Sequence, residues 1–365
     1  MAIEIIATGR SVPERRITNE DLAKKIDTSD EWIRSHTGIG SRHIADENTA
    51  TSDLGAAAAL EALKMAIKRG AVSEKSPVHS TEQAQHRRCV ASEGSPLEEL
   101  VLTVDFIVLG TSTPDYYCCP PTSCIVQHIL GAKNAASMDI TAACSGFIYG
   151  METAAALLNA DSRRKRALVI GVDLLSRVTD WDDRSTCVLF GDGAGAVLLE
   201  KTASQNEAGK STRGLLRTIL KADGSGWEHL IARRGVSRAP WKKGETIEKS
   251  SVITMNGQAV YNFAVGAITE ILDRMMNEEK IGIQDLALII PHQANARIVQ
   301  AAGKRLKIPE EKLYLNIEEY ANTSSASIPI ALDELNRSGA LKKGDLIMTV
   351  GFGAGLTYGG NLIRW

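Results

Sequence analysis

The sequence predicts an α/β protein built from two halves that share the same order of strands and helices. Short apolar runs rich in β-branched residues, which are typical of buried strands, alternate along the chain with helical stretches. This order occurs once in residues 1–200 and again in residues 201–365, and each half ends in a glycine-punctuated strand motif, at residues 192–200 and 355–365. Alternating strands and helices favour parallel sheets covered by helices, so we expect a duplicated α/β fold.

The first half supplies its elements in a clear order. Residues 104–115 form an apolar run that ends in turn residues and predict a buried strand, and Thr122–Leu130 predict a helix. A short segment, residues 136–147, then leads into an alanine-rich helix through Leu158, and residues 166–173 predict another strand.

The second half repeats this order. Residues 286–295 predict a strand and a turn, followed by a helix through Lys304. A loop-rich segment, residues 313–327, precedes a predicted helix at 328–335 and a strand at 345–353. If the halves superpose, loops from both meet at the pseudo-symmetry axis, and side chains far apart in sequence converge there.

Two polar segments interrupt this pattern. Residues 72–99 carry mixed charge and almost no apolar periodicity, and residues 233–250 form a basic loop with two helix breakers. We expect both to be surface insertions that do not help to build the core.

Composition excludes several classes of protein. With 365 residues, 44% of them hydrophobic, and a net charge of −2, the chain has a globular composition and lacks the basic excess of nucleic-acid-binding proteins. No apolar run approaches the ~20 residues of a membrane helix, and no secretory signal is visible. Six cysteines in so long a chain fit a reducing compartment, so we expect a cytoplasmic protein.

Two motifs resemble ligand sites only superficially. Cys118, Cys119, Cys124 and His128 lie close together, but structural zinc usually uses two separated ligand pairs, so no metal site is predicted. Residues 191–196, GDGAGA, continue as a strand instead of opening a helix, which argues against a dinucleotide loop. We expect these glycines to let backbones approach each other closely.

Cys144 lies where a predicted strand gives way to a helix, and this place suggests a nucleophile. Unpaired N–H groups and the helix dipole favour an anion there, so we expect a thiol pKa lowered into the range of ~3.5–7.5. Small neighbours, Ala142 to Gly146, leave room for a substrate, and the Cys144 amide is placed to stabilise an oxyanion. The alternative is a cysteine that serves as a small buried hydrophobe.

His292 and Asn322 are the candidate partners of Cys144. His292 follows a predicted strand directly, at the end where ligands gather in α/β folds. Asn322 precedes a helix and is either a helix cap or a donor to developing negative charge. The residues alone leave both interpretations open.

Six dispersed motifs together resemble β-ketoacyl-acyl-carrier-protein synthase III, a family of the thiolase superfamily. They are residues 29–44, 139–147, 190–196, 291–298, 322–329 and 351–360. The resemblance covers nearly the whole chain except the two insertions. It implies a five-layered α-β-α-β-α fold with two mostly parallel mixed sheets.

The resemblance also implies a reaction. Members of the family start fatty-acid synthesis by condensing an acyl-CoA with malonyl-acyl carrier protein, without a metal or redox cofactor. Cys144 would accept the acyl group, and the backbone N–H groups of Cys144 and Ala354 would form the oxyanion hole, although the family usually has glycine at the position of Ala354. His292 and Asn322 would bind the thioester carbonyl of the malonyl group and stabilise the enolate that decarboxylation leaves.

The family's binding surfaces map onto further residues. Trp32 and Arg184 match the positions that hold the adenine of CoA, and His36 stands where the family usually has a CoA-contacting arginine, so CoA affinity is expected to be weaker or pH-dependent. Arg297, Lys304 and Arg305 share one helix face and would dock the acidic carrier protein, while a basic family position is Asn262 here.

Acyl-chain selection maps onto one more position. A residue of the partner subunit, often phenylalanine, closes the family's acyl pocket, and this position falls on Cys119. The correspondence implies a homodimer, and a pocket open to longer or branched starters.

Three alternatives remain at this point. Related condensing enzymes of secondary metabolism use malonyl-CoA or another acceptor. A cysteine thioester hydrolase would release free acid, and a non-catalytic binding protein would need no nucleophile. A requirement for acyl carrier protein, or the product formed, distinguishes them.

Overall fold

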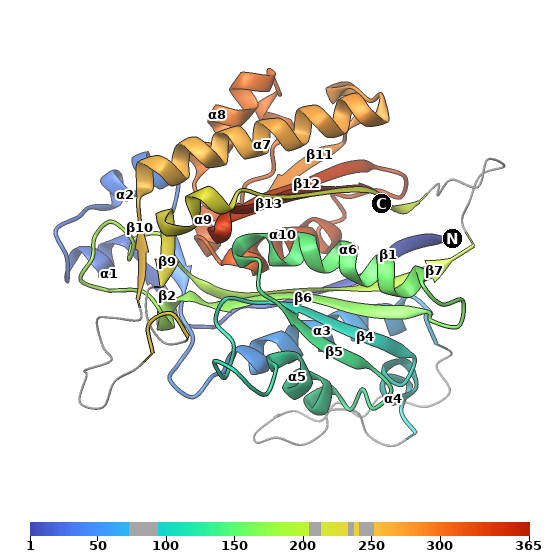
Figure 1. Ribbon diagram of the computed structural model, residues 1–365. Coiled ribbons are helices and arrows are strands. Elements are labelled where there is room, and N and C mark those ends of the chain that lie inside the picture. The colour runs from blue at the N-terminus through green and yellow to red at the C-terminus, as the bar shows by residue number, and fades with distance from the viewer. Residues whose placement is uncertain (73–93, 204–212, 233–236, 241–251) are drawn as a thin grey trace.

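A computed structural model describes residues 1–72, 94–203, 213–232, 237–240 and 252–365 of the chain. Two sheets and three layers of helices stack in the order helix, sheet, helix, sheet, helix (Figure 1). The predicted five-layered arrangement is therefore present. In the described part of the chain, no helix has the length and apolarity needed to span a membrane.

The first sheet has five strands in the order β1-β7-β6-β4-β5. Its strands are β1 (Ala2–Ser11), β7 (Asp192–Thr202), β6 (Arg166–Leu174), β4 (Val104–Gly110) and β5 (Ala136–Ile140). β4 pairs in parallel with both β5 and β6, whereas β7 is antiparallel to both of its neighbours. Four strands thus run in one direction and β7 runs in the other.

The second sheet has four strands in the order β11-β12-β13-β8. Its strands are β11 (Leu288–Pro291), β12 (Leu346–Gly353), β13 (Thr357–Arg364) and β8 (Gly214–Ala222). Here β13 alone is reversed, because it is antiparallel to β12 and to β8 while β11 and β12 are parallel. Both sheets are mixed and mostly parallel in strand direction, as predicted.

The two sheets follow one topology. β1, β7, β6 and β4 in the first sheet correspond in order to β8, β13, β12 and β11 in the second. The counterpart of β5 is reduced to a single parallel bridge between Ile289 and Leu313. The glycine-rich motifs form the reversed strand of each sheet. The proposed division at residue 200 falls inside β7, so it stays an interpretation of the repeat.

Helices separate and cover the sheets, and three hydrophobic clusters fill the spaces between the layers. The central pair is α6 (Gly146–Asn159) and α10 (Ser327–Arg337); one outer layer has α3 (Thr51–Lys68), α4 (Pro96–Val101) and α5 (Thr122–Leu130); the other has α7 (Gly257–Glu279) and α8 (Ala296–Leu306). One cluster lies under α3, the second surrounds α6 and α10 between the sheets, and the third lies under α7 and α8.

Smaller elements lie at one end of the layers. They are α1 (Asn19–Ala23), α2 (Asp30–Thr37), α9 (Ile317–Tyr320), and the strand pairs β2 (Arg16–Thr18) with β3 (Ser41–His43) and β9 (Leu230–Ala232) with β10 (Ile253–Met255). A fourth hydrophobic cluster ties α2 to α8 and α9. This end of the molecule carries the site described below.

The glycine motif at residues 191–196 is part of β7 and not a dinucleotide loop. A Cβ on Gly195 would lie 2.7 Å from the Ile330 nitrogen of α10. The helix backbone therefore packs directly on the strand, which confirms the predicted close approach of two backbones.

The prediction that residues 72–99 form an insertion outside the core is wrong for the two ends of this segment. α4 starts at Pro96, and Val72 and Leu97 pack against the cluster under α3. The polar composition of the segment hid these apolar anchors. Residues 73–93 lie outside the described residues, as does most of the segment 233–250, of which only 237–240 are described.

Candidate active site

The nucleophile loop lies between β5 and α6. Cys144 is in a short 3-10 turn, η1 (Ala143–Ser145), and Ala143 adopts a left-handed backbone conformation with φ of 47°. Thr357 of β13 holds this loop from both sides, because its hydroxyl donates to the Ala142 carbonyl at 2.8 Å and its carbonyl accepts from the Ser145 hydroxyl at 3.1 Å. The half-buried Cys144 is thus presented at the start of a central helix.

The second half has an equivalent turn, η6 (Ser324–Ala326), before α10. Its first residue, Ser324, also has a positive φ, of 52°. Left-handed conformations are uncommon for residues other than glycine and often occur at functional turns. The Cys144 loop and the Asn322 loop are therefore related by the repeat in local conformation as well as in topology.

The thiol pKa expectation is wrong in direction. Burial raises the pKa of the Cys144 thiol to about 12, and the negative charge of Asp173 adds to the rise, while a hydrogen bond with Ser324 opposes it. The start of a helix favours an anion, but here desolvation outweighs it. The Cys144 thiol is therefore neutral at physiological pH.

The end of β12 lies against the Cys144 amide. A Cβ on Gly353 would be 2.6 Å from the Cys144 nitrogen, so only a glycine allows this approach. Ala354 follows in the turn η7 (Ala354–Leu356), and its carbonyl accepts from the Thr357 hydroxyl at 3.2 Å. The close approach to the Cys144 nitrogen is made at residue 353 and not at residue 354. The methyl group of Ala354 is therefore accommodated beside the nucleophile loop.

His292 follows β11 and is buried. Its N–H donates to the Val350 carbonyl at 2.8 Å, and its ring Nδ1 lies 2.7 Å from the Ser327 hydroxyl. The Ser327 hydroxyl accepts a hydrogen bond from the Gln293 N–H at 3.4 Å. Among the described residues, the acceptor for the proton of this hydroxyl is Nδ1 of His292. We therefore assign the histidine proton to Nε2.

The Nε2 atom of His292 is buried and has no hydrogen-bond partner among the described residues. Burial lowers the pKa of His292 to about 3, so the ring is neutral at physiological pH. A neutral ring with Nε2–H available is a hydrogen-bond donor and not an acid. Buried polar groups are rarely left unpaired, so this nitrogen marks a place for a ligand.

Asn322 is oriented by its own loop. Its side-chain oxygen accepts from the Ser324 N–H at 2.8 Å, and its NH₂ group has no acceptor among the residues that the structure describes. Its backbone pairs with the glycine motif of the first half, donating to Leu189 and accepting from Gly191. The Asn322 oxygen therefore accepts from the first residue of η6, as the capping interpretation expects, while its role as a donor to developing negative charge stays a prediction.

The segment after Asn322 contacts both other candidate loops. The turn η6 packs against η1, which carries Cys144, and the Ser327 hydroxyl of α10 lies 2.7 Å from His292 Nδ1. Sequence reasoning missed Ser324, Ser327 and the buried Asp173. The run of serines after Asn322, and an aspartate at the end of a predicted central strand, were the available signals.

The predicted CoA contacts lie together on α2 and a neighbouring loop. The rings of Trp32 and His36 stack at 4.4 Å, and the Arg184 guanidinium lies 4.2 Å from the Trp32 ring centroid. An adenine between indole and guanidinium needs about 7 Å, or two stacking distances of ~3.5 Å. The two side chains contact each other and leave no space for a ring between them in this structure, so their role in CoA binding stays a prediction.

The histidine of this cluster has a fixed orientation. His36 donates from Nδ1 to the Trp32 carbonyl at 2.7 Å, which leaves Nε2 as an acceptor when the ring is neutral. Asn295, from the turn after His292, donates to the His36 carbonyl at 3.0 Å. The cluster is thereby joined to the loop that carries His292.

The predicted docking residues are exposed on α8. Arg297, Lys304 and Arg305 form no ion pair with any residue that the structure describes. Asn262, on α7, is also exposed and accepts from the Gln258 amide at 3.0 Å. The basic face therefore starts next to the His292 loop and is free to meet a partner.

The predicted gate residue, Cys119, lies in an exposed loop beside Tyr116 and Tyr117, whose exposed fractions are 53% and 64%. Such exposure is unusual for large aromatic side chains and is typical of interaction surfaces. β5, the strand that leads to Cys144, is one of the two edge strands of the first sheet in the described part of the chain.

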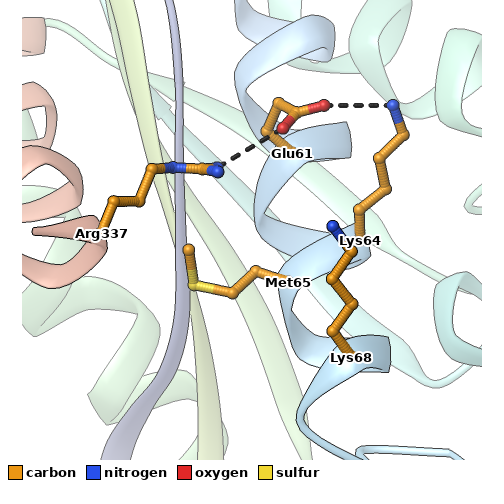
Figure 2. A pocket seen from close by; sticks show the side chains of 5 residues that line it. All are labelled: Glu61, Lys64, Met65, Lys68 and Arg337. Atoms are coloured by element: carbon orange, nitrogen blue, oxygen red, sulfur yellow. Dashed lines mark hydrogen bonds and ion pairs between the residues drawn. The ribbon is translucent and has the colours of Figure 1, made fainter. Parts of the chain in front are cut away.

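A shallow cavity elsewhere contains none of these residues. Figure 2 shows its lining, Glu61, Lys64, Met65 and Lys68 of α3 with Arg337 of α10. Glu61 forms ion pairs with Lys64 and Arg337, so much of its charge is balanced. No group of three or more metal-ligating side chains occurs in the described ranges of the chain.

The site has a thiol on a turn packed against a glycine of β12, with two neutral hydrogen-bond donors on neighbouring loops. Together with the duplicated five-layer fold, these features define a thiolase-like acyltransferase. Sequence similarity places the chain more narrowly. Residues 138–224 match the family "3-Oxoacyl-[acyl-carrier-protein (ACP)] synthase III", and residues 276–365 match its C-terminal domain.

Relatives resemble the chain over its full length. The β-ketoacyl-[acyl-carrier-protein] synthase III of Syntrophomonas wolfei is 42% identical over all of this chain and 98% of its own, and that of Clostridium acetobutylicum is 41% identical over 100% and 99%. The crystal structure of the Aquifex aeolicus enzyme has a TM-score of 0.81, with 38% identity and full coverage of both chains. The chain belongs to the β-ketoacyl-acyl-carrier-protein synthase III family, and the predicted family, fold and enzyme class are confirmed.

Proposed function

We propose that the protein starts fatty-acid synthesis by condensing an acyl-CoA with malonyl-acyl carrier protein. Membership of the family supports this function. The observation that carries it at the site is the buried Nε2 of His292, which has no hydrogen-bond partner among the described residues, together with the Asn322 NH₂ group, for which the described part of the chain supplies no acceptor. Two neutral donors suit an enolate oxygen, whereas hydrolysis would call for a base that activates water.

In the first step, the Cys144 sulfur attacks the thioester carbonyl of the acyl-CoA. The negative charge on the carbonyl oxygen is stabilised by the backbone N–H groups of Cys144 and Ala354. CoA leaves as the carbon–sulfur bond breaks, and the acyl group remains on Cys144. Covalent catalysis splits one difficult condensation into two easier steps.

In the second step, malonyl-acyl carrier protein places its thioester oxygen between His292 Nε2–H and the Asn322 amide. Carbon dioxide leaves, and its bonding electrons form an enolate whose charge these donors stabilise. The enolate carbon attacks the acyl-Cys144 carbonyl and releases the β-ketoacyl carrier protein and the free cysteine. One such donor contributes about 2.7–4 kcal/mol. The decarboxylation supplies the driving force, so we propose that no metal or redox cofactor takes part.

Substrate binding requires one local movement. Arg184 leaves the face of Trp32 so that the adenine of CoA enters between them. His36 contributes a charged donor to CoA phosphates only when its Nε2 is protonated. The exposed cations of α8 would guide the acidic carrier protein toward the His292 loop, because unpaired charges on a surface steer oppositely charged partners.

We further propose a cytoplasmic homodimer in which the free edge of β5 and the loop around Cys119 meet the same elements of the partner. An unpaired edge strand and exposed aromatics are features that proteins usually cover. The small Cys119 side chain would leave the partner's acyl pocket open to longer starters. Replacing it by phenylalanine should restrict turnover to short acyl-CoAs.

A second candidate stays within the superfamily. The "Priming beta-Ketosynthase from the R1128 Polyketide Biosynthetic Pathway" is 29% identical to the chain over 100% of it, with a TM-score of 0.81. The same fold and chemistry therefore serve secondary metabolism in that protein. This alternative differs in the pathway that uses the product and in the acceptor.

The proposed function is tested by loading the protein with a series of radiolabelled acyl-CoAs and then adding malonyl-acyl carrier protein or malonyl-CoA. We expect label on the wild-type protein but not on Cys144→Ser, and transfer to β-ketoacyl carrier protein. Transfer to malonyl-CoA alone would favour the second candidate. Release of label only as free acid would contradict condensation.

A further inference from the structure

A positive charge lies buried near the Asn322 loop and has no part in the steps above. Arg42, in the short strand β3, has an exposed fraction of 0%. Burial lowers the pKa of Arg42 to about 10, so the guanidinium keeps its charge at physiological pH. No Asp or Glu side chain that the structure describes forms an ion pair with Arg42. A buried cation without a contacting carboxylate is costly, because its lost hydration is not replaced by an opposite charge.

The hydrogen bonds of Arg42 go to neutral acceptors. Nη1 donates to Asn19 Oδ1 at 2.7 Å, and Nη2 donates to the Val188 carbonyl at 2.8 Å. Asn19 is also buried, and its NH₂ group donates to Asp30 Oδ1 at 2.8 Å and to the Ile39 carbonyl at 2.8 Å. A carboxylate therefore lies one side chain away from the guanidinium, and the Asn19 amide is oriented between the two charges.

The carbonyl that Arg42 binds belongs to the segment 188–191, which in turn contacts Asn322. The Leu189 carbonyl accepts from the Asn322 N–H at 2.9 Å, and the Gly191 N–H donates to the Asn322 carbonyl at 3.0 Å. This segment is part of no helix or strand among the described elements. Its backbone therefore depends on individual hydrogen bonds for its position, and Arg42 supplies one of them.

The strand β3 contacts the surroundings of Asn322 in two further ways. A Cβ on Gly191 would lie 3.3 Å from the Arg42 Cβ, so the segment packs closely on the arginine. The Ser41 hydroxyl donates to the Glu319 carbonyl at 2.9 Å, in the helix α9. β3 thus holds both the helix that precedes Asn322 and the segment that pairs with it.

The nucleophile loop is held by other residues. Thr357 of β13 bonds the backbone and side chain on either side of Cys144, and Gly353 of β12 packs against the Cys144 nitrogen. None of the hydrogen bonds of Arg42 in the described part of the chain reaches this loop. The contacts of Arg42 therefore bear on Asn322 and leave the support of the nucleophile unchanged.

We propose that Arg42 is a positioning residue for Asn322. Its guanidinium holds the Val188 carbonyl, and the segment 188–191 then fixes the Asn322 backbone so that the NH₂ group meets the malonyl thioester oxygen. A charged donor suits this task, because hydrogen bonds from ionised groups are stronger than those between neutral groups. Arg42 touches no substrate and transfers no proton. This inference rests on the proposed function, of which it concerns the second step.

The test measures acyl loading and condensation separately, in single-turnover assays with an acyl-CoA and then malonyl-acyl carrier protein. Arg42→Met removes both donors at similar side-chain length, and Arg42→Lys keeps the charge but loses the planar fork. Arg166→Met is the matched control. Arg166 is a largely buried arginine that forms an ion pair with Glu200, and it begins β6, at the opposite end of that strand from the site.

The proposal predicts that Arg42→Met loads acyl groups at the wild-type rate but condenses about tenfold more slowly, because a small displacement of a catalytic group has a large effect on rate. Arg42→Lys should show a smaller loss of the same kind, and Arg166→Met should change neither step. Equal losses in loading and condensation would overturn the proposal, as would an equal slowing of condensation in Arg166→Met. If Arg42→Met does not fold, Arg42→Lys is judged by the same criteria.

The wild type separates this inference from the proposed function. Normal condensation by both Arg42 variants would overturn the inference alone. Absence of condensation by the wild type would overturn the proposed function and this inference with it.

Asn322→Ala supplies an independent criterion, because it removes the donor that Arg42 is proposed to position. Residues that act through one another give losses that do not add. In the Asn322→Ala background, Arg42→Met should therefore slow condensation little further, by less than about twofold. A full additional loss would show that Arg42 acts elsewhere and would contradict the proposal.

Discussion

Ser327 lies 2.7 Å from Nδ1 of His292 and thereby determines which ring nitrogen carries the proton. The serine belongs to the first turn of α10, and the histidine follows β11, so the contact joins a central helix to the second sheet. Nε2 has no hydrogen-bond partner among the described residues. It carries the ring proton, and can donate it, only while the Ser327 hydroxyl donates to Nδ1.

Replacing Ser327 by alanine should slow the condensation step and leave acyl loading unchanged. Without the hydroxyl, the histidine proton redistributes between the two nitrogens, and the site loses part of its enolate donor. We expect a fall of about tenfold in the condensation rate, less than complete loss of the donor would give. Ser327→Thr, which keeps the hydroxyl, should restore the rate. Single-turnover assays that measure loading and condensation separately provide the comparison, and equal losses in both steps would contradict this role.

Stability should depend on pH through His292. Burial lowers its pKa to about 3 in the folded protein, against about 6.5 in an unfolded chain. Between these values the unfolded state binds one more proton, so the free energy of unfolding should decrease as pH falls from about 6.5 toward 3. In His292→Gln this dependence should weaken, whereas His128→Gln, a control at an exposed histidine, should retain it. Urea unfolding at several pH values measures the slope; equal slopes in wild type and His292→Gln would refute the prediction.

The contact between Arg184 and Trp32 should affect CoA binding and not chemistry. Arg184→Lys keeps the charge but loses the planar group that stacks on adenine. We expect KM for acyl-CoA to rise about fivefold with kcat unchanged, in keeping with the usual size of such contacts. Lys343→Arg is the control, because it changes an exposed lysine at the far end of the second half. Steady-state kinetics measure KM and kcat for each variant. A lowered kcat with unchanged KM would show that this pair acts on the chemical step.

Carrier-protein docking should depend on the charge of α8. Arg297→Glu reverses an exposed charge that has no ion-pair partner among the described residues. KM for malonyl-acyl carrier protein should rise and lose part of its salt dependence, because exposed charges attract partners less as ionic strength grows. The KM for acyl-CoA should stay the same, and Lys343→Glu should have no effect on either. A comparable rise in both KM values would place Arg297 in the CoA site instead.

The sequence predicted the elements that depend on local patterns. The helix that the sequence predicts over residues 122–130 has the bounds of α5. The duplicated order of strands and helices gave the layers, and the reversed strands β7 and β13 coincide with the glycine motifs. Such features are properties of adjacent residues.

Features that depend on contacts between distant segments could not be predicted in this way. The thiol pKa was expected to fall, but burial and Asp173 raise it, and neither is visible from the residues around Cys144. The closed contact of Arg184 on Trp32 depends on a loop more than 150 residues away in sequence. The apolar anchors Val72 and Leu97 were hidden because the polar segment between them dominated the composition.

The central claim is that Cys144 carries the acyl group while His292 and Asn322 act only on the malonyl thioester. The most direct test is mass spectrometry of the intact protein after addition of acyl-CoA and again after malonyl-acyl carrier protein, for the wild type, Cys144→Ser, His292→Ala and Asn322→Ala. We predict an acyl adduct on all except Cys144→Ser, with its discharge slowed about 10²–10³-fold in His292→Ala and Asn322→Ala. Failure of these two variants to load, or their discharge at the wild-type rate, would contradict the account.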